Sequence, residues 1–462
     1  MAAHGILAAD ELRQLVASDN VDTVLVCFTD MQGRLMGKRV TGRYFVDTVL
    51  EGTIEACDYL LAVDVDMTPL PGYTFASWDT GYGDMSLVPD LATLRLVPWI
   101  PKTALVLSDL VHEGTTEPIR VSPRQILRHQ LQRAADLGLT VKIGAELEFF
   151  LFKDTYAEAK QKRYHGLTPY SDWIEDYHIL QTTRDEHIIR QIRNGMDAAG
   201  VPVEFSKGEA GYGQHEINLV YAEALEMADR QVIYKNGAKE IAAANDVAIT
   251  FMAKWSMDDV GSSCHIHSSV WADGGTRSLA LASDGSSVPD GGLSPTVQHW
   301  LGGLLAASRE LTWLFAPNVN SYKRFMPDSW APTAVAWGDD NRTCGLRIVG
   351  HGAHRRVESR IPGADVNPYL AYAGVIAAGL HGIENELDPG AAFEGNAYES
   401  TEVTRIPSTL VEAIDLFEGS DLAKAAFGDD VHHHLLNTAR QEWLASNRAV
   451  TDWELLRGFE RL

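Results

Sequence analysis

The chain of 462 residues has few cysteines, few basic residues and no long apolar run. Its four cysteines, Cys27, Cys57, Cys264 and Cys344, form no CxxC pair, which indicates a reduced, cytoplasmic setting. No stretch of about 18 consecutive apolar residues occurs, so we expect no membrane span. The start of the chain lacks a basic segment followed by an apolar one, so we expect no signal peptide.

Basic residues are outnumbered, with 39 Lys and Arg against 63 Asp and Glu and a formal net charge of −24. No basic stripe offsets this charge, so neither nucleic acid nor an anionic membrane is an expected partner. The surplus of carboxylates is compatible with a cation site.

A phosphate-binding P-loop is also missing. The stretch GRLMGKRV, residues 33–40, has a Gly-Lys pair, but its spacing is one residue short and no Ser or Thr follows Lys38. We interpret it as a turn between two strands. If the protein binds a nucleotide, other groups hold the phosphates.

The composition of the chain changes along its length and predicts two domains. A short amphipathic helix at 7–18 and strand-like, turn-rich segments up to about residue 110, among them YLLAVDVD at 59–66, predict a small, mainly β domain over residues 1–112. Alternating strands and helices predict a larger domain over residues 113–462. The fold class is therefore α+β.

Two helices of the larger domain have clear sequence signals. The stretch SPRQILRHQLQRAADLG predicts a helix with Ser122 as N-cap, Pro123 at its first position and Gly138 near its end. A long apolar helix is expected near 366–387.

The stretch GAELEFFLF, residues 144–152, predicts a buried strand that carries two glutamates. Glu146 and Glu148 point to the same face, because side chains alternate along a strand. A solvated edge strand would explain them, yet in apolar surroundings two carboxylates repel each other and lose hydration. A cation between them would remove that repulsion.

Other segments add the same kind of side chain from strands or glycine-rich turns. They contribute Glu209 and Glu216 in EAGYGQHEIN, His265 and His267 in CHIHSS, and Glu358 in HRRVESR. Each segment alone is a weak signal, since a His-x-His pair is more often ordinary strand polarity. Together they match the oxygen-rich shells, with an occasional nitrogen, that Mg²⁺ and Mn²⁺ prefer.

Six arginines follow in a short span: Arg324, Arg342, Arg347, Arg355, Arg356 and Arg360. A solvated basic face would explain two of them. The others sit beside apolar or turn residues, and guanidinium groups suit bidentate binding of carboxylate and phosphate. Carboxylates for metals and arginines for anions are typical of phosphoryl transfer.

The order of these motifs, GAELEFF, GQHEINL, CHIHSS, NSYKR, NRTCGLR and RRVESRIPGADVNPYL, resembles the type I glutamine synthetase family of ATP-dependent glutamate–amine ligases. The resemblance runs from about residue 20 to the closing VTDWELLRGFERL. It implies a β-grasp-like N-terminal domain and a catalytic domain built on an antiparallel sheet. It also implies active sites shared between subunits of hexameric rings, which usually stack into a dodecamer.

The resemblance assigns roles by position. It implies two or three Mg²⁺ or Mn²⁺ ions per site, with Glu148, Glu209 and Glu216 as ligands of one ion and Glu146, His265 and Glu358 as ligands of another. It implies nucleotide contacts from Glu204, His267, Ser269 and Arg356. It implies L-glutamate contacts from Gly261, Arg324, Arg342 and Arg360, with Arg342 and Arg347 facing the transferred phosphate of ATP.

The sequence departs from the glutamine-forming members at the ammonium pocket. Those members carry a glutamate six residues after the arginine of NSYKR, where this chain has Trp330. Their ammonium-holding aspartate aligns with Ala76, although Asp79 is close enough to replace it after a local shift. These changes favour a larger amine such as ethanolamine, a polyamine or an alkylamine. The indole of Trp330 would supply an apolar wall and a cation–π surface.

Three alternatives stay open at this point: a glutamine synthetase that uses ammonia, a dinuclear metallohydrolase, and a non-catalytic regulatory paralogue. The sequence leaves the acceptor of the amine proton open between Asp79 and an oxygen of the acyl phosphate.

Overall fold

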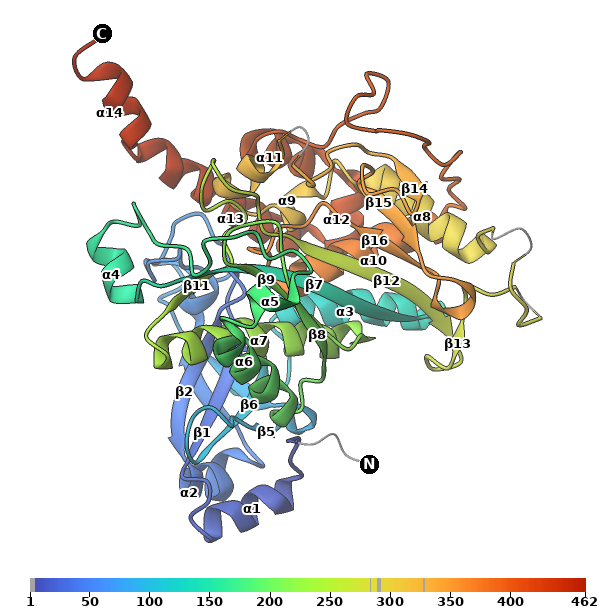
Figure 1. Ribbon diagram of the computed structural model, residues 1–462. Coiled ribbons are helices and arrows are strands. Elements are labelled where there is room, and N and C mark those ends of the chain that lie inside the picture. Colours follow the sequence, from blue (N-terminus) through green and yellow to red (C-terminus); the bar gives the residue numbers. More distant parts are fainter. Residues whose placement is uncertain (1–4, 283, 289–291, 327–328) are drawn as a thin grey trace.

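The computed structural model describes residues 5–282, 284–288, 292–326 and 329–462, and it contains two separate sheets (Figure 1). The first has six strands in the order β2-β1-β6-β4-β3, with β5 paired to β6. Its strands are β1 Thr23–Thr29, β2 Leu35–Thr41, β3 Ile54–Cys57, β4 Asp84–Pro89, β5 Arg95–Leu96 and β6 Thr103–His112. Strands β1 and β6 are parallel, while β1 and β2 form an antiparallel hairpin.

The turn between β1 and β2 overlaps the beginning of the stretch with the Gly-Lys pair. The Asp30 carboxylate accepts hydrogen bonds from the backbone N–H groups of Gln32 and Arg34, and Gly33 adopts a φ of +76°. Lys38 lies inside β2. Of the stretch interpreted as a turn, only Gly33 and Arg34 lie between the two strands, and the Gly-Lys pair belongs to β2.

The strand expected at 59–66 is wrong. Residues Asp58–Leu61 form a 3₁₀ turn. The Asp64 side chain then accepts hydrogen bonds from the N–H groups of Asp66 and Thr68. Such local side-chain bonds compete with strand pairing.

The second sheet has ten strands and is antiparallel except for the described pair β14–β15. Its main order is β14-β15-β16-β12-β7-β9-β8, with β10 and β11 paired to β7 and β13 to β12. The strands are β7 Thr140–Phe152, β8 Val203–Gly208, β9 Gln214–Leu219, β10 Ala222–Glu223, β11 Ala248–Thr250, β12 Cys264–Ala272, β13 Arg277–Ser278, β14 Trp337–Asp339, β15 Leu346–Val349 and β16 Arg356–Ser359. The long central strand β7 contains the two glutamates, as predicted.

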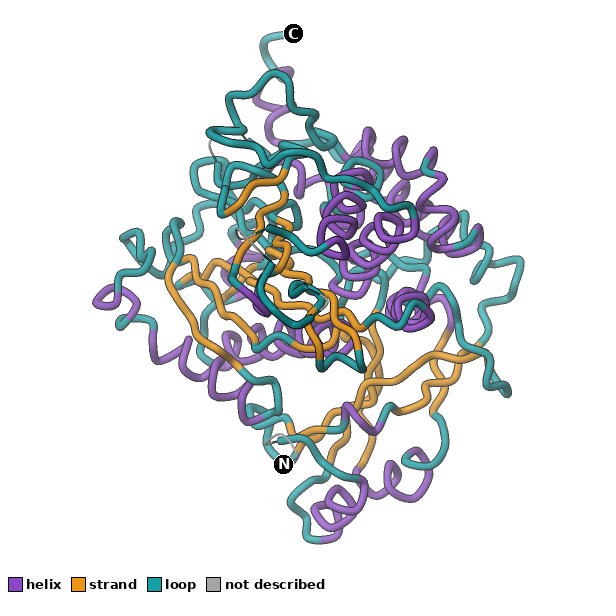
Figure 2. The backbone as a smooth tube through the Cα atoms, turned by 90° about the vertical axis from the view of Figure 1, so that its right-hand side faces the viewer, coloured by secondary structure: helices purple, strands orange, loops and turns teal. Residues whose placement is uncertain are grey.

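Helices pack beside these strands, which run through the middle of the molecule (Figure 2). Those before β7 are α1 Ala9–Ala17, α2 Gly42–Tyr44 and α3 Pro123–Asp136. Those between β7 and β12 are α4 Tyr156–Gln161, α5 Ile179–Thr182, α6 Glu186–Ala198 and α7 Ala224–Ala244. The rest are α8 Pro295–Ala307, α9 Thr312–Phe315, α10 Pro368–Glu384, α11 Leu410–Gly419, α12 Asp421–Phe427, α13 Asp429–Arg448 and α14 Asp452–Gly458.

The two helices with clear sequence signals form where they were expected. Ser122 is the N-cap residue of α3 and Pro123 its first residue, but the Ser122 side chain makes no capping hydrogen bond. In α10, the Asn367 side chain caps the helix by accepting from the N–H of Tyr369. Helix α10 is almost wholly buried and packs against α3, α7 and α8, so it forms the centre of the helical layer.

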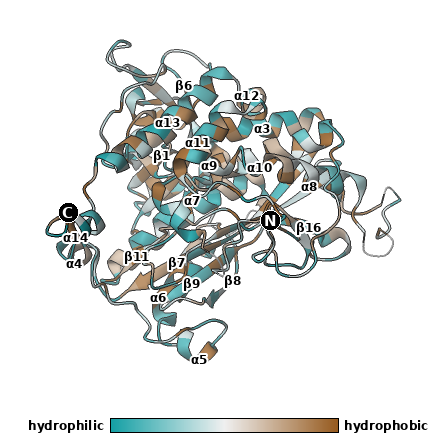
Figure 3. Ribbon diagram, turned by 90° about the horizontal axis from the view of Figure 1, so that it is seen from above, coloured by the Kyte–Doolittle hydropathy of each residue, from teal (hydrophilic) through white to brown (hydrophobic). Residues whose placement is uncertain are grey.

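Hydrophobic stretches follow β7 and β11 through the interior, where Phe149, Leu151 and Ile249 are buried (Figure 3). None of the helices in the described part of the chain is long and apolar enough to cross a membrane. The α+β fold class is confirmed. The boundary after residue 112 stays a proposal; it coincides with the end of β6.

Candidate active site

Strand register brings the predicted carboxylates and imidazoles together. Strand β7 lies between β9 and β12, so that Glu148 pairs with Glu216 and Glu146 pairs with His265. On the far side of β12, His267 pairs with Glu358 of β16. Directly opposed residues on one face of a sheet lie close together. The sheet thus gathers side chains that are widely separated in the sequence.

The first cluster contains Glu148, Glu209 and Glu216, whose carboxylate oxygens lie within 4.8 Å of one another. Burial and the charge of Glu209 raise the pKa of Glu148 to about 8. Burial and the neighbouring carboxylates raise the pKa of Glu216 well above its ordinary value. Without a bound cation, this cluster therefore retains protons near neutral pH.

Polar neighbours fix the position of this cluster. Ser263 donates to the two carboxylate oxygens of Glu148, from its hydroxyl at 2.6 Å and its backbone N–H at 2.7 Å. The side-chain amide of Gln214 donates to Glu148 at 3.2 Å. Lys207 forms an ion pair with Glu209. Hydrogen bonds and ion pairs of this kind hold a carboxylate in the orientation in which it can bind an ion.

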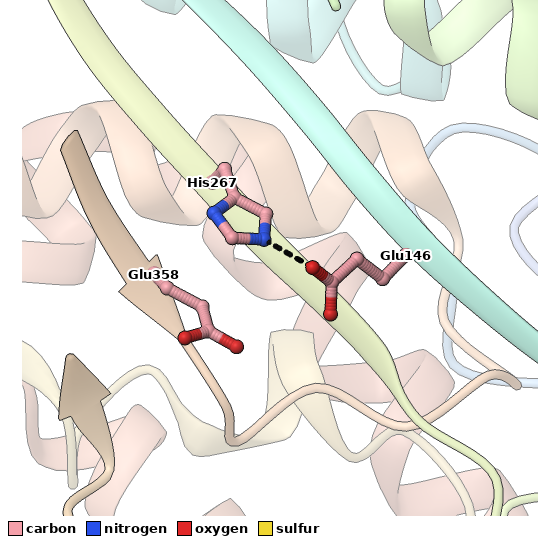
Figure 4. Close-up of side chains that lie close together, drawn as sticks. All are labelled: Glu146, His267 and Glu358. Atoms are coloured by element: carbon pink, nitrogen blue, oxygen red, sulfur yellow. Dashed lines mark hydrogen bonds and ion pairs between the residues drawn. The ribbon is translucent and has the colours of Figure 1, made fainter. Parts of the chain in front are cut away.

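The second cluster contains Glu146, His267 and Glu358, which face one another from β7, β12 and β16 (Figure 4). Nε2 of His267 lies 2.9 Å from Glu146 Oε1. Nδ1 of His265 lies 3.0 Å from Glu146 Oε2 and 3.7 Å from Glu358 Oε1. Both histidines are therefore within reach of these two carboxylates.

His265 fits a metal ligand by its chemistry. Its Nε2 is buried without a hydrogen-bond partner. Burial and the charge of Arg360 lower its pKa to about 4. Neutral imidazole is the form that binds metals. The donor set thus fits a divalent cation, and the choice between His265 and His267 as ligand stays a prediction.

Four of the predicted arginines lie next to these carboxylates, and two of them contact Glu358. Arg360 and Arg347 donate to the two oxygens of Glu358 at 2.7 Å and 2.9 Å. Arg324 is 3% exposed and donates to the backbone oxygens of Ile361 and Arg360. Arg342 is exposed, on the turn before β15. Three guanidinium groups are thus fixed by protein contacts, beside a cluster of carboxylates.

Two cavities meet at this sheet. The central one has a volume of about 470 Å³ and the second about 300 Å³, and Glu146 and Asn218 line both of them. The central cavity is lined by the predicted residues Glu146, Glu148, Glu209, Glu216, Gly261, His265, Arg324, Trp330, Arg342, Arg347 and Arg360. The second cavity is lined by four of the five predicted nucleotide contacts, Glu204, His267, Ser269 and Arg356, while the fifth, Arg347, lines the central cavity.

Gly261 is required by a close approach. A Cβ atom at this position would lie 2.6 Å from Cγ of Arg324 and 2.8 Å from the backbone oxygen of Ala253. Any side chain would therefore push Arg324 away from the central cavity.

Sequence reasoning missed several residues of the cavity wall: Asp176, Tyr177, Lys207, Gln214 and Ser263. Tyr177 is 73% exposed, and its ring lies 4.4 Å from the Lys207 ammonium group. Asp176 and Tyr177 come from an irregular segment without a periodic pattern. Gln214 lies inside the motif GQHEINL, and Ser263 directly precedes the motif CHIHSS, so both were adjacent to predicted ligands.

Comparison with known proteins identifies the architecture that holds this site. The model of the glutamine synthetase catalytic domain matches residues 120–457. The chain belongs to the glutamine synthetase family. The predicted family, its fold and its branch of glutamate–amine ligases are confirmed by this match and by the relatives.

Among these relatives, the gamma-glutamylethanolamide synthetase GlnA4 of Streptomyces coelicolor is 52% identical over 456 residues, 99% of this chain and 96% of that protein. The glutamate–isopropylamine ligase of a Pseudomonas species is 38% identical over 451 residues, 97% of each chain. A solved structure of a GmaS/ADP complex has a TM-score of 0.82 and 29% identity, covering 97% of this chain and 99% of that one.

The positions that correspond to the ammonium-binding residues of glutamine-forming members lie in different parts of the structure. Trp330 lines the central cavity, is 62% exposed and has a φ of +60°. Ala76 is fully buried, in a small cluster with Ala62 and Tyr73. Asp79 is exposed. Neither residue 76 nor residue 79 is part of the wall of the central cavity within the described chain.

Proposed function

We propose that this member of the glutamine synthetase family joins the γ-carboxylate of L-glutamate to a primary organic amine, at the expense of ATP. Ethanolamine or a polyamine is favoured over ammonia. The observation that carries this proposal is Trp330 in the wall of the central cavity, in place of a carboxylate. The relatives named for ethanolamide and isopropylamine ligation support it.

The second cavity is proposed to hold ATP, with its γ-phosphate directed past Glu146 into the central cavity. The residues that would hold two or three Mg²⁺ or Mn²⁺ ions are the two carboxylate clusters and His265. When bound, these ions neutralise phosphate charge as Lewis acids. The related GmaS structure is a complex with ADP, which supports nucleotide binding in this fold.

In this proposal the arginines bind the anionic groups of glutamate and of the transferred phosphate. Arg324 and Arg360 bind and orient glutamate, and Arg342 and Arg347 face the phosphate as it moves. The γ-phosphate is transferred to the glutamate side-chain oxygen, which forms γ-glutamyl phosphate and releases ADP. The nitrogen of the neutral amine then attacks the carbonyl carbon, the C–N bond forms, the bond to phosphate breaks, and the nitrogen loses one proton and keeps one N–H in the amide.

Phosphate release distinguishes this function from the alternatives. The ligase releases phosphate from ATP only when glutamate and an amine are both present. A glutamine synthetase releases it fastest with ammonia, a metallohydrolase needs neither glutamate nor amine, and a regulatory paralogue releases none. Measurement of phosphate release with each component omitted tests all four.

We also propose a homo-oligomer, with a dodecamer of two hexameric rings as the expected form. Helix α14 extends away from the body of the chain (Figure 1), and it carries Trp453 and Leu456 and is followed by Phe459, which are 66%, 76% and 85% exposed. A second subunit would cover this apolar surface. Light scattering tests the mass, and a fully active monomer would contradict the proposal. A cytoplasmic location, consistent with four free cysteines, completes it.

A further inference from the structure

A third group of metal-binding side chains lies outside both cavities. It consists of Glu175, Asp185 and His215, whose ligand atoms lie within 4.8 Å of one another. Nε2 of His215 lies 2.8 Å from Asp185 Oδ2 and 3.5 Å from Glu175 Oε2. None of the three residues lines the central cavity or the second cavity.

This group faces away from the catalytic cavity. His215 precedes Glu216 on β9, and successive side chains of a strand point to opposite faces. His215 pairs across the sheet with Phe149, whose ring lies 6.0 Å from the imidazole. The three side chains are therefore covered by the apolar side of the sheet and by the segment that precedes α6.

The burial of these carboxylates is the unusual observation. The segment from 172 to 184 is mostly exposed, with Trp173, Ile179 and Leu180 at 59%, 80% and 68%. In the same segment Glu175 is 0% exposed, and Asp185, which follows the segment, is also 0% exposed. A segment that exposes its apolar side chains and buries a glutamate reverses the usual preference.

The buried oxygens also lack hydrogen-bond donors. Both carboxylate oxygens of Glu175 and Oδ1 of Asp185 are buried without a hydrogen-bond partner. An isolated buried carboxylate is strongly unfavourable, so buried charges are normally paired or bound to metals. His215 alone cannot satisfy two carboxylates. The geometry points to a missing cation.

We propose that Glu175, Asp185 and His215 bind a structural transition-metal ion, of the zinc or manganese kind. One imidazole and two carboxylates are ligands that such ions accept. Mg²⁺ fits less well, because it usually keeps several waters and this site is closed to solvent.

The ion has a structural consequence for the catalytic cavity. It ties two ends of one segment, at Glu175 and Asp185, to strand β9. Asp176 and Tyr177, which lie between these ends, form part of the wall of the central cavity. The ion thus holds a wall of the amine-binding region in place without contacting the substrates.

The test uses full-length protein in which Glu148→Gln and Glu358→Gln weaken the two catalytic clusters. After removal of metals with EDTA and reloading with Zn²⁺ in excess Mg²⁺, elemental analysis should give about one more zinc per chain in this background than after further Glu175→Gln. Zn²⁺ should also raise the thermal midpoint of the background and not that of the Glu175→Gln variant. Mn²⁺ is tested in the same way.

Asp172→Asn is the matched control, because Asp172 lies in the same segment, is exposed and pairs with Lys153. It should retain the zinc. If Glu175→Gln fails to fold, Asp185→Asn gives the same reading. Equal zinc and manganese content with and without the three side chains would overturn the proposal and indicate that the carboxylates share a proton instead.

Discussion

Two groups of acidic residues in this chain differ in how far basic side chains balance their charge. The first links the first sheet to helices α3 and α7: Arg124 donates to Asp229 at 2.9 Å and 3.0 Å, to Asp109 at 2.6 Å and to Asp90 at 2.7 Å. Arg128 adds bonds to Asp90 and Asp109 at 3.0 Å. Against burial, the hydrogen bond from Arg124 lowers the pKa of Asp90 below its ordinary value.

The second group is the cluster of Glu148, Glu209 and Glu216 in the central cavity. Among the described residues, Lys207 forms an ion pair with Glu209, whereas neither Glu148 nor Glu216 forms an ion pair with a basic side chain. The pKa values of Glu148 and Glu216 are raised by burial and by like charges. The group around Arg124 carries its own counter-charges, whereas the carboxylates of the central cavity have fewer of them, which supports the proposed cation site.

The largest expected effect concerns the group around Arg124. Arg124→Met should lower the free energy of unfolding by about 3–5 kcal/mol, because removal of one partner leaves buried charges uncompensated. Chemical denaturation of the variant measures this loss. Arg13→Met is the control, since Arg13 pairs with Glu51 on the surface and should cost less than about 1 kcal/mol. Equal losses in the two variants would show that the group does not stabilise the junction between the first sheet and helices α3 and α7.

Glu216→Gln should lower activity and not stability. We expect turnover to fall at least 100-fold, because even residues that only orient metal ligands contribute about 10- to 100-fold. The metal-free protein should keep or gain stability, since a neutral amide replaces a buried carboxyl group that is kept protonated by burial and by the neighbouring carboxylates. Steady-state rates in Mg²⁺ and unfolding in EDTA give the two readings. The exposed Glu113→Gln is the control, and normal turnover of Glu216→Gln would refute the metal site.

Trp330 should affect the choice of amine more modestly. A cation–π contact is worth about 0.5–2 kcal/mol. Trp330→Glu should therefore increase the KM for the organic amine by a factor between about 2 and about 30. Glutamine formation from ammonia should rise, because a carboxylate returns to the cavity. Trp330→Phe, which keeps an aromatic ring, should retain most of the selectivity. Unchanged selectivity in both variants would exclude Trp330 from the amine pocket.

A further expected effect is a pH dependence of the stability of the metal-free protein. A carboxyl group with a raised folded-state pKa binds more protons when folded, so its contribution to stability falls as pH rises. With the pKa of Glu148 at about 8, the metal-free protein should lose stability between about pH 5 and pH 8. Saturating Mg²⁺ should remove this loss, and its binding near pH 7 should release protons. Calorimetry in two buffers of different ionisation enthalpy detects that release. If no protons are released, the carboxylates of this cluster are not protonated in the metal-free protein, and the explanation is wrong.

The residues of the site that strand alternation could predict lie on β7 and β12. Alternation along β7 places Glu146 and Glu148 on one face, and it places His265 and His267 together on β12. The same alternation cannot separate the roles of these two histidines, which both reach Glu146. The expected strand at 59–66 failed because the local hydrogen bonds of Asp64 have no signature in hydropathy.

The parts that could not be predicted depend on long-range packing. Asp176 and Tyr177 lie in an irregular segment that is bridged from Ile174 to Tyr212 and from Asp176 to Gly208, contacts that no periodic pattern reveals. The group of Glu175, Asp185 and His215 combines this segment with a strand residue next to a predicted ligand. Alternation along β9 places His215 on the opposite face from Glu216, but only the fold shows that Glu175 and Asp185 meet it there.

The central claim is that the cavity lined by Trp330 accepts an organic amine in place of ammonia. The most direct test is phosphate release from ATP with L-glutamate and Mg²⁺, measured for ethanolamine, a polyamine, isopropylamine and ammonia at equal concentration. The account predicts that at least one organic amine supports turnover well above ammonia, with the corresponding γ-glutamyl amide as product. Glutamine formation as fast as the formation of any γ-glutamyl amide would contradict it.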